Sequence, residues 1–108
     1  MYLEVDNYIL VHAGFTFDMP NPFEENHSML WQRYWYGKVN YGWLQNRIII
    51  HGHTPKPKNE ILELYNKLEE NQYLNIDGGC CFKGIKEDMG NLFCFEMTEK
   101  LLFCQEKV

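Results

Sequence analysis

Residues Ile48–Pro55, with the sequence IIIHGHTP, combine an apolar run with two histidines, a glycine and a proline. An unbroken run of β-branched residues is typical of a strand that is buried on both faces of a sheet. A polar side chain at the end of such a strand projects from the edge of the sheet, and the glycine allows the backbone to turn tightly there. We therefore expect a strand at about Arg47–His51 with imidazole groups at its exit.

The same arrangement occurs earlier in the chain, where Ile9–Gly14 has the sequence ILVHAG. We expect a strand at Tyr8–His12, with His12 at its carboxyl end. Two imidazoles at two strand exits suggest half of a metal site, because imidazole is the commonest metal ligand in proteins. The alternative is that each histidine is a packed, hydrogen-bonded residue with a structural role only.

The remaining segments predict an α/β fold with a mixed sheet that ends in an antiparallel hairpin. A helix is expected from Ser28, where large residues recur at helical spacing, and a second after Asn59 as its cap. A third strand is expected at Tyr73–Asp77, and a closing hairpin at Asn91–Met97 and Lys100–Cys104.

The composition limits the classes of function. The chain has 108 residues and a net charge of -5, and it lacks a long basic run, which argues against nucleic acid as a partner. It shows neither a signal segment nor an apolar stretch of membrane length, so we expect a cytoplasmic protein without a membrane partner. The four cysteines form no C-x-x-C pair, which predicts buried free thiols rather than disulfides or a zinc ribbon.

Four segments together resemble a known family. In chain order they are Val11–Phe15 (VHAGF), Leu30–Arg33 (LWQR), His51–Pro55 (HGHTP) and Asn75–Cys80 (NIDGGC). They are similar to the second half of calcineurin-like metallophosphoesterases of the bacterial serine/threonine protein phosphatase type. The resemblance covers nearly the whole chain and implies that residues 1–108 are a single partial domain, the C-terminal half of a metallophosphoesterase α/β sandwich.

The resemblance implies a role for five side chains. His12 and His53 would bind one ion of a two-metal centre, with manganese, iron, nickel or zinc as candidate metals. Arg33 would hold the substrate phosphate through its planar guanidinium group. Asp77 would orient a ligand histidine or shape the cleft. His51 would face the same way as His53 in an extended strand and could chelate the same ion, but the family pattern favours His53 alone and leaves His51 a supporting role.

The resemblance also implies that catalytic groups are missing. The first half of the family's domain supplies the bridging aspartate and the general acid, and no matching segment occurs here. We therefore assign no catalytic residue in this chain and expect an inactive fragment with exposed apolar surface that self-associates. The expected function is hydrolysis of a phosphoprotein, or alternatively of a dinucleoside polyphosphate.

A hypothesis from another class is a non-catalytic module. Its protein-binding surface would be an aromatic cluster, and its histidines would be structural. The cluster comprises Trp31, Trp35, Tyr36, Tyr41 and Trp43.

Overall fold

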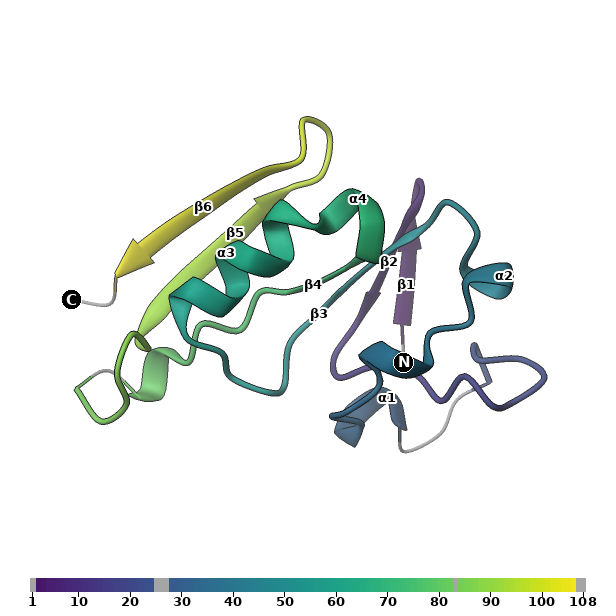
Figure 1. Cartoon of the computed structure of the whole chain (residues 1–108), viewed down its shortest axis with the longest axis horizontal. Helices are drawn as coiled ribbons and strands as arrows, with labels where there is room; N and C mark the ends of the chain where they lie inside the picture. Colours follow the sequence, from purple (N-terminus) through teal and green to yellow (C-terminus); the bar gives the residue numbers. More distant parts are fainter. Residues whose placement is uncertain (1, 25–27, 83, 107–108) are drawn as a thin grey trace.

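The computed structural model describes residues 2–24, 28–82 and 84–106 and contains two sheets (Figure 1). A four-stranded sheet has the strand order β1-β2-β3-β4, and a separate two-stranded sheet is formed by β5 and β6. The strands are β1 (Tyr2–Val5), β2 (Tyr8–Val11), β3 (Ile48–His51), β4 (Tyr73–Asn75), β5 (Asn91–Glu96) and β6 (Leu101–Glu106). The helices are α1 (Ser28–Trp31), α2 (Tyr41–Leu44), α3 (Lys58–Asn66) and α4 (Leu68–Asn71), with 3₁₀ turns η1 (Tyr36–Lys38) and η2 (Cys80–Phe82).

The mixed α/β fold with an antiparallel hairpin is confirmed. Strands β2, β3 and β4 run parallel, with Leu10 opposite Ile50 and Ile50 opposite Leu74, whereas β5 and β6 are antiparallel. Parallel strands end at the same edge of their sheet. The residues that follow β2, β3 and β4 therefore lie at the same edge of the sheet.

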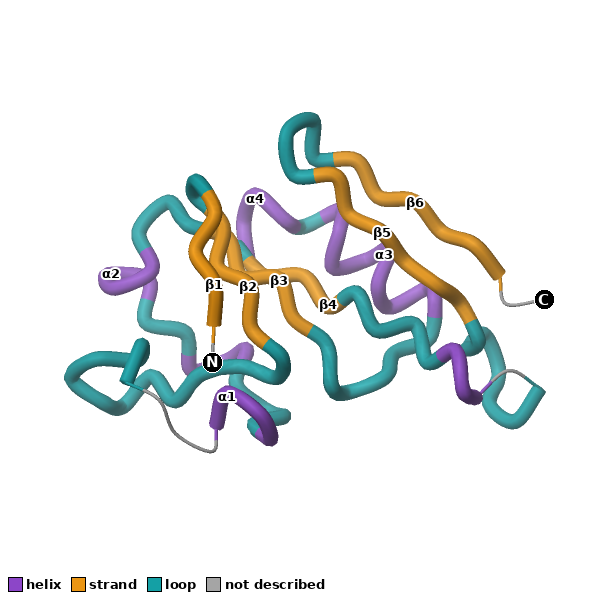
Figure 2. Tube along the Cα trace, turned by 180° about the vertical axis from the view of Figure 1, so that it is seen from behind, coloured by secondary structure: helices purple, strands orange, loops and turns teal. Residues whose placement is uncertain are grey.

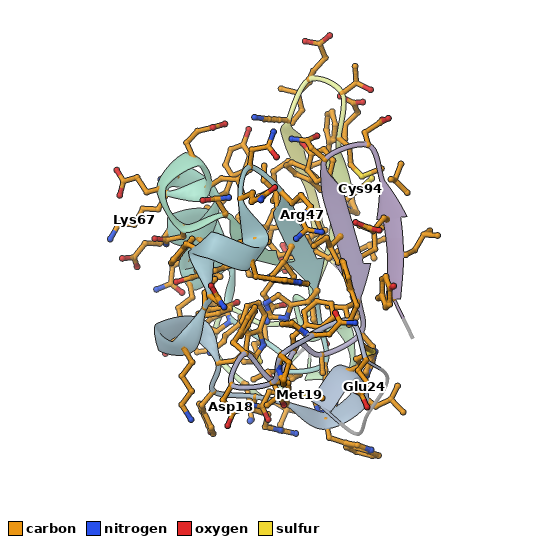
Figure 3. The ribbon with its side chains drawn as sticks, turned by 90° about the vertical axis from the view of Figure 1, so that its right-hand side faces the viewer. Asp18, Met19, Glu24, Arg47, Lys67 and Cys94 are labelled. Carbon is orange, nitrogen blue, oxygen red and sulfur yellow. The ribbon has the colours of Figure 1, made fainter. Side chains whose placement is uncertain are left out.

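Strand β1 was not predicted from the sequence. It pairs antiparallel with β2, so that Tyr2 lies opposite Val11. Strand β1 therefore covers the edge of the sheet at β2. Arg47 also fastens β1, because its guanidinium group lies 3.2 Å from the Glu4 carboxylate. Figure 3 shows Arg47 beside these strands.

An aromatic core fills one face of the four-stranded sheet. Figure 2 shows α1 and α2 on the β1 side of the molecule, and α3 with the hairpin on the β4 side. On the β1 side Trp35 is fully buried, and its indole N–H donates a 3.0 Å hydrogen bond to the carbonyl of Ala13. The buried residues of this core are Ile9, Val11, Phe15, Phe17, Met29, Trp35, Leu44, Ile49 and Tyr73.

Helices α3 and α4 and strand β5 cover a second core. Ile61 and Leu68 pack with Ile50, Leu74 and Phe93. Helix α3 begins at Lys58 and has Pro57 at its N-cap position, so Asn59 is not the cap that the sequence suggested. Proline is favoured at a helix start because its backbone dihedral is already suitable.

Two further sequence expectations differ from the structure. Helix α1 ends at Trp31. Of the large residues that follow, Trp35 and Tyr36 pack into the core from irregular backbone and from η1, whereas Tyr34 is exposed. The prediction of buried thiols is also wrong, since Cys80 is half-buried and Cys81, Cys94 and Cys104 are exposed. Cys94 lies on the hairpin (Figure 3), and Cys80 and Cys81 lie in η2 rather than in a strand.

Apolar side chains are exposed on β1 and on the hairpin. Leu3, Leu92 and Phe103 are each more than half exposed, at 57%, 62% and 56%. The expected exposed apolar surface is therefore present, and self-association through it stays a prediction. Among the described residues, no helix is both long and apolar enough to cross a membrane.

The packing of Trp35 against Gly14 generates a test of the aromatic core. A Cβ atom at Gly14 would overlap the indole ring of Trp35, whereas a Cβ at the exposed Gly37 would have no neighbour within 4 Å. Overpacking a core costs about 1–3 kcal/mol. We expect Gly14→Ala to lower the free energy of unfolding in urea by about this amount and Gly37→Ala to leave it nearly unchanged. Equal effects of the two substitutions would contradict this description of the core.

Candidate functional site

The exits of β2 and β3 bring His12 and His53 into contact. The backbone N–H of Gly52 donates a 2.8 Å hydrogen bond to the carbonyl of His12, which joins the two strand exits one residue out of the register of β2 and β3. Beyond this bond, Nε2 of His12 lies 3.2 Å from Nδ1 of His53. The two histidines that the sequence proposed as joint ligands are therefore neighbours, although they are 41 positions apart in the chain.

His53 occupies an unusual backbone conformation. Its φ angle is 74°, in the left-handed region that side chains other than glycine seldom adopt. Its ring packs edge-on against Trp31 with centroids 5.5 Å apart, and its Nε2 is buried without a hydrogen-bond partner among the described residues. Strained backbone and an unsatisfied buried polar atom both cost free energy, and such features concentrate at functional sites.

The surroundings of His53 favour a neutral imidazole. Burial lowers the pKa of His53, and the positive charge of Arg33 and the ring of His12 lower this pKa further. The carboxylate of Asp77 acts in the opposite direction and raises the pKa in part. The net shift is downward, so His53 is neutral at neutral pH, the protonation state that binds metal ions.

His51 has a different environment from His53. Strand β3 ends at His51, so the extended geometry that would make these two histidines face the same way is not present. Nε2 of His51 lies 2.6 Å from the hydroxyl of Tyr36, and Nδ1 lies 3.1 Å from the carbonyl oxygen of Gly52. His51 is buried, and its ring also packs edge-on against Trp35. Both nitrogens therefore make contacts within the protein, and neither contacts His53.

Asp77 and Arg33 are charged neighbours of His53. A hollow of about 730 Å³ is lined by His12, His53 and Asp77 and continues along apolar side chains of β2, β3 and β5. Oδ1 of Asp77 accepts a 3.1 Å hydrogen bond from the N–H of Gly79, which fixes the carboxylate beside the hollow. Arg33 is exposed and close enough for its charge to act on His53.

The pair of imidazoles does not amount to a complete metal site. Within the described ranges, no group of three or more histidine, cysteine, aspartate or glutamate side chains is placed to hold a metal ion. The fit to a metal therefore rests on two ligands, His12 and His53, whose facing nitrogens lie 3.2 Å apart.

The sequence placed Tyr36 in the aromatic cluster but did not predict its contact with His51. Its ring stacks on Tyr73 with centroids 3.9 Å apart, and its hydroxyl reaches His51. Burial raises the pKa of Tyr36, so this hydroxyl stays protonated and can donate to His51. No local pattern signals this contact, because it joins η1 to β3 through the tertiary fold.

The chain matches no protein-family model, no curated protein and no solved structure. Its function is therefore inferred from the geometry of the site and from the sequence resemblance.

The burial of His51 predicts a pH dependence of stability. Burial lowers the pKa of His51 from 6.5 to about 4, so the unfolded chain binds this proton more tightly than the folded chain. The stability due to neutral His51 is fully present above pH 6.5 and is lost as the pH falls from 6.5 towards 4. The full shift corresponds to about 3 kcal/mol.

Urea unfolding at a series of pH values checks this expectation, with His51→Gln as the non-titrating comparison. We expect the free energy of unfolding of the parent chain to fall more steeply than that of His51→Gln over this pH interval. Parallel pH profiles would contradict a buried neutral His51.

Proposed function

We propose that this chain forms part of a metal-dependent phosphoester hydrolase, similar to the calcineurin-like phosphatases, in which His12 and His53 bind one divalent ion. The observation that carries the proposal is the 3.2 Å approach of His12 Nε2 to His53 Nδ1 at the shared edge of the parallel strands. Two imidazole nitrogens that each lie about 2.1 Å from a tetrahedral zinc ion are about 3.4 Å apart. The observed spacing is therefore close to the spacing of two ligands on one ion.

Other features of the pair support this assignment. Burial and the nearby positive charge lower the pKa of His53, which favours the neutral imidazole that binds a cation. The strained backbone at His53 is also explained if this conformation directs the ring towards His12.

Arg33 and Asp77 have complementary roles in the proposal. The guanidinium group of Arg33 presents several N–H donors in one plane and is suited to two oxygens of a phosphate. Asp77, held by Gly79, would supply negative charge beside the histidines and favour a bound cation. When bound, the ions of such a centre lower the pKa of water and neutralise charge on the phosphoryl group.

We further propose that the remaining metal ligands and the general acid come from residues other than those described here. Two imidazoles alone bind divalent ions weakly compared with three- or four-ligand sites, and a third ligand is absent from the described residues. We accordingly expect no turnover of a phosphoester by the 108-residue chain alone. Phosphoproteins remain the proposed substrates, with dinucleoside polyphosphates as the alternative.

The aromatic module receives less support from the structure. Trp35 is fully buried, and Tyr36 and Trp43 are half-buried against the core. Trp31 and Tyr41 are the exposed members, so the five residues do not form one continuous surface. Trp35, Tyr36 and Trp43 serve mainly to pack the core.

Isothermal titration with Zn²⁺ or Mn²⁺ tests the paired ligands. Loss of an outer-sphere partner typically weakens metal binding about 10–100-fold, and loss of a direct ligand should cost at least as much. We expect His12→Ala and His53→Ala each to weaken binding by about tenfold or more. His51→Gln should retain saturable binding, since its nitrogens contact Tyr36 and Gly52.

A parallel assay with p-nitrophenyl phosphate tests the missing groups. Metal binding that is lost in both alanine variants, with no hydrolysis by any of the proteins, supports the proposal. Binding that survives the removal of both imidazoles would overturn the metal assignment. Hydrolysis by the parent chain that is lost in the variants would show that the chain carries a complete catalytic site.

A further inference from the structure

A second hollow borders His51 and the residues that follow His53 in the chain. It measures about 240 Å³, and Arg33, Thr54 and Lys56 contribute its polar lining while the Tyr34–Tyr36 segment forms an aromatic wall. His51 is the residue that lines both this hollow and the larger one containing the histidine pair. The two hollows are therefore distinct, and the smaller one is below the usual size of pockets for drug-sized ligands.

The loop that carries Thr54 and Lys56 is held rigidly. The side-chain amide of Asn75, which is fully buried, donates a 2.8 Å hydrogen bond to the carbonyl of Thr54. The backbone N–H of Lys56 donates a 2.9 Å hydrogen bond to the carbonyl of Asp77. Lys56 also lies between Pro55 and Pro57, which restrict the backbone on both sides. The backbone of Lys56 is therefore already fixed before a ligand binds, so binding costs little backbone entropy.

The hollow has no acidic lining residue among those described. Arg33 and Lys56 both line it. Neither cation forms an ion pair with a described residue. Glu60 and Glu63 lie with Lys56 in a neighbouring hollow, and Glu63 pairs there with Lys67 at 3.7 Å. Two like charges thus converge in one hollow of a protein whose net charge is -5.

We propose that this hollow binds a tetrahedral oxyanion, phosphate or a phosphoryl group, between Arg33 and Lys56. Arginine and lysine are the side chains that bind phosphate most commonly, the first through paired N–H donors and the second as a point charge. The hydroxyl group of Thr54 is available as a further donor on the anchored loop. This site requires no metal ion. It shares Arg33 with the proposed phosphatase site and adds Lys56 and Thr54, and it does not depend on metal binding by His12 and His53.

The test is titration of the EDTA-treated full chain with inorganic phosphate and, separately, with phosphoserine, at constant ionic strength. Calorimetry gives the affinity, and ¹H–¹⁵N NMR reports the amide signals of Thr54 and Lys56. Lys56→Ala is compared with Lys58→Ala, which removes the same charge from an exposed residue outside this hollow. Thermal unfolding confirms that both variants fold.

We expect saturable binding by the parent chain and about tenfold weaker binding by Lys56→Ala, because a hydrogen bond to a charged group is lost. Lys58→Ala should bind as the parent does. Tighter binding of inorganic phosphate identifies the free anion as the ligand, and tighter binding of phosphoserine identifies a phosphoryl group on a larger molecule. Absence of saturable binding by the parent chain, or equal losses in both lysine variants, would overturn the proposal. Because no metal is present, either result is independent of the metal-binding test.

Discussion

The parallel pairing of β2 with β3 is the constraint on which the candidate site depends. Past the strand ends, the register that sets Leu10 opposite Ile50 shifts by one residue, because Gly52 donates its N–H to the carbonyl of His12. This bond places His12 beside His53, and the pairing of β3 with β4 adds Asp77 to the same edge. A shift of one residue in this register would move alternate side chains to the opposite face. The contact between the histidines thus depends on the alignment of the buried strands and on the one-residue shift at their exits.

The aromatic core and the site share residues, so stability and function are linked. Trp35 packs against Gly14 and donates to the carbonyl of Ala13, directly after His12. Tyr36, which lies in η1, contacts His51 at the end of β3 and thereby supports the backbone that leads to His53. Two histidines separated by one glycine accordingly differ in role: His51 is a neutral, buried part of the core, and His53 is turned towards the neighbouring strand exit. Changes in the aromatic packing are expected to be transmitted to the histidine pair.

The sequence predicted the elements with strong local patterns and missed those that tertiary contacts create. The parallel strands around Ile49 and the closing hairpin follow from unbroken and alternating apolar runs. Strand β1 was missed because its four residues are mostly exposed and carry no buried pattern. The helix expected from Ser28 is shorter than predicted, because the spacing of large residues after Trp31 reflects core packing rather than one helical face. The meeting of His12 with His53 was foreseen from their places at strand exits, but the left-handed backbone of His53 and the Tyr36 contact depend on the folded chain.

The central claim, that His12 and His53 form one metal-binding pair, is tested most directly by NMR of histidine labelled with ¹⁵N in its ring. Addition of Zn²⁺ to the full chain should shift the ring nitrogens of His12 and His53 together, at the same metal concentration. The ring nitrogens of His51 should keep their positions, because they contact Tyr36 and Gly52. Separate responses of His12 and His53, or a metal-induced shift of His51 alone, would contradict the account.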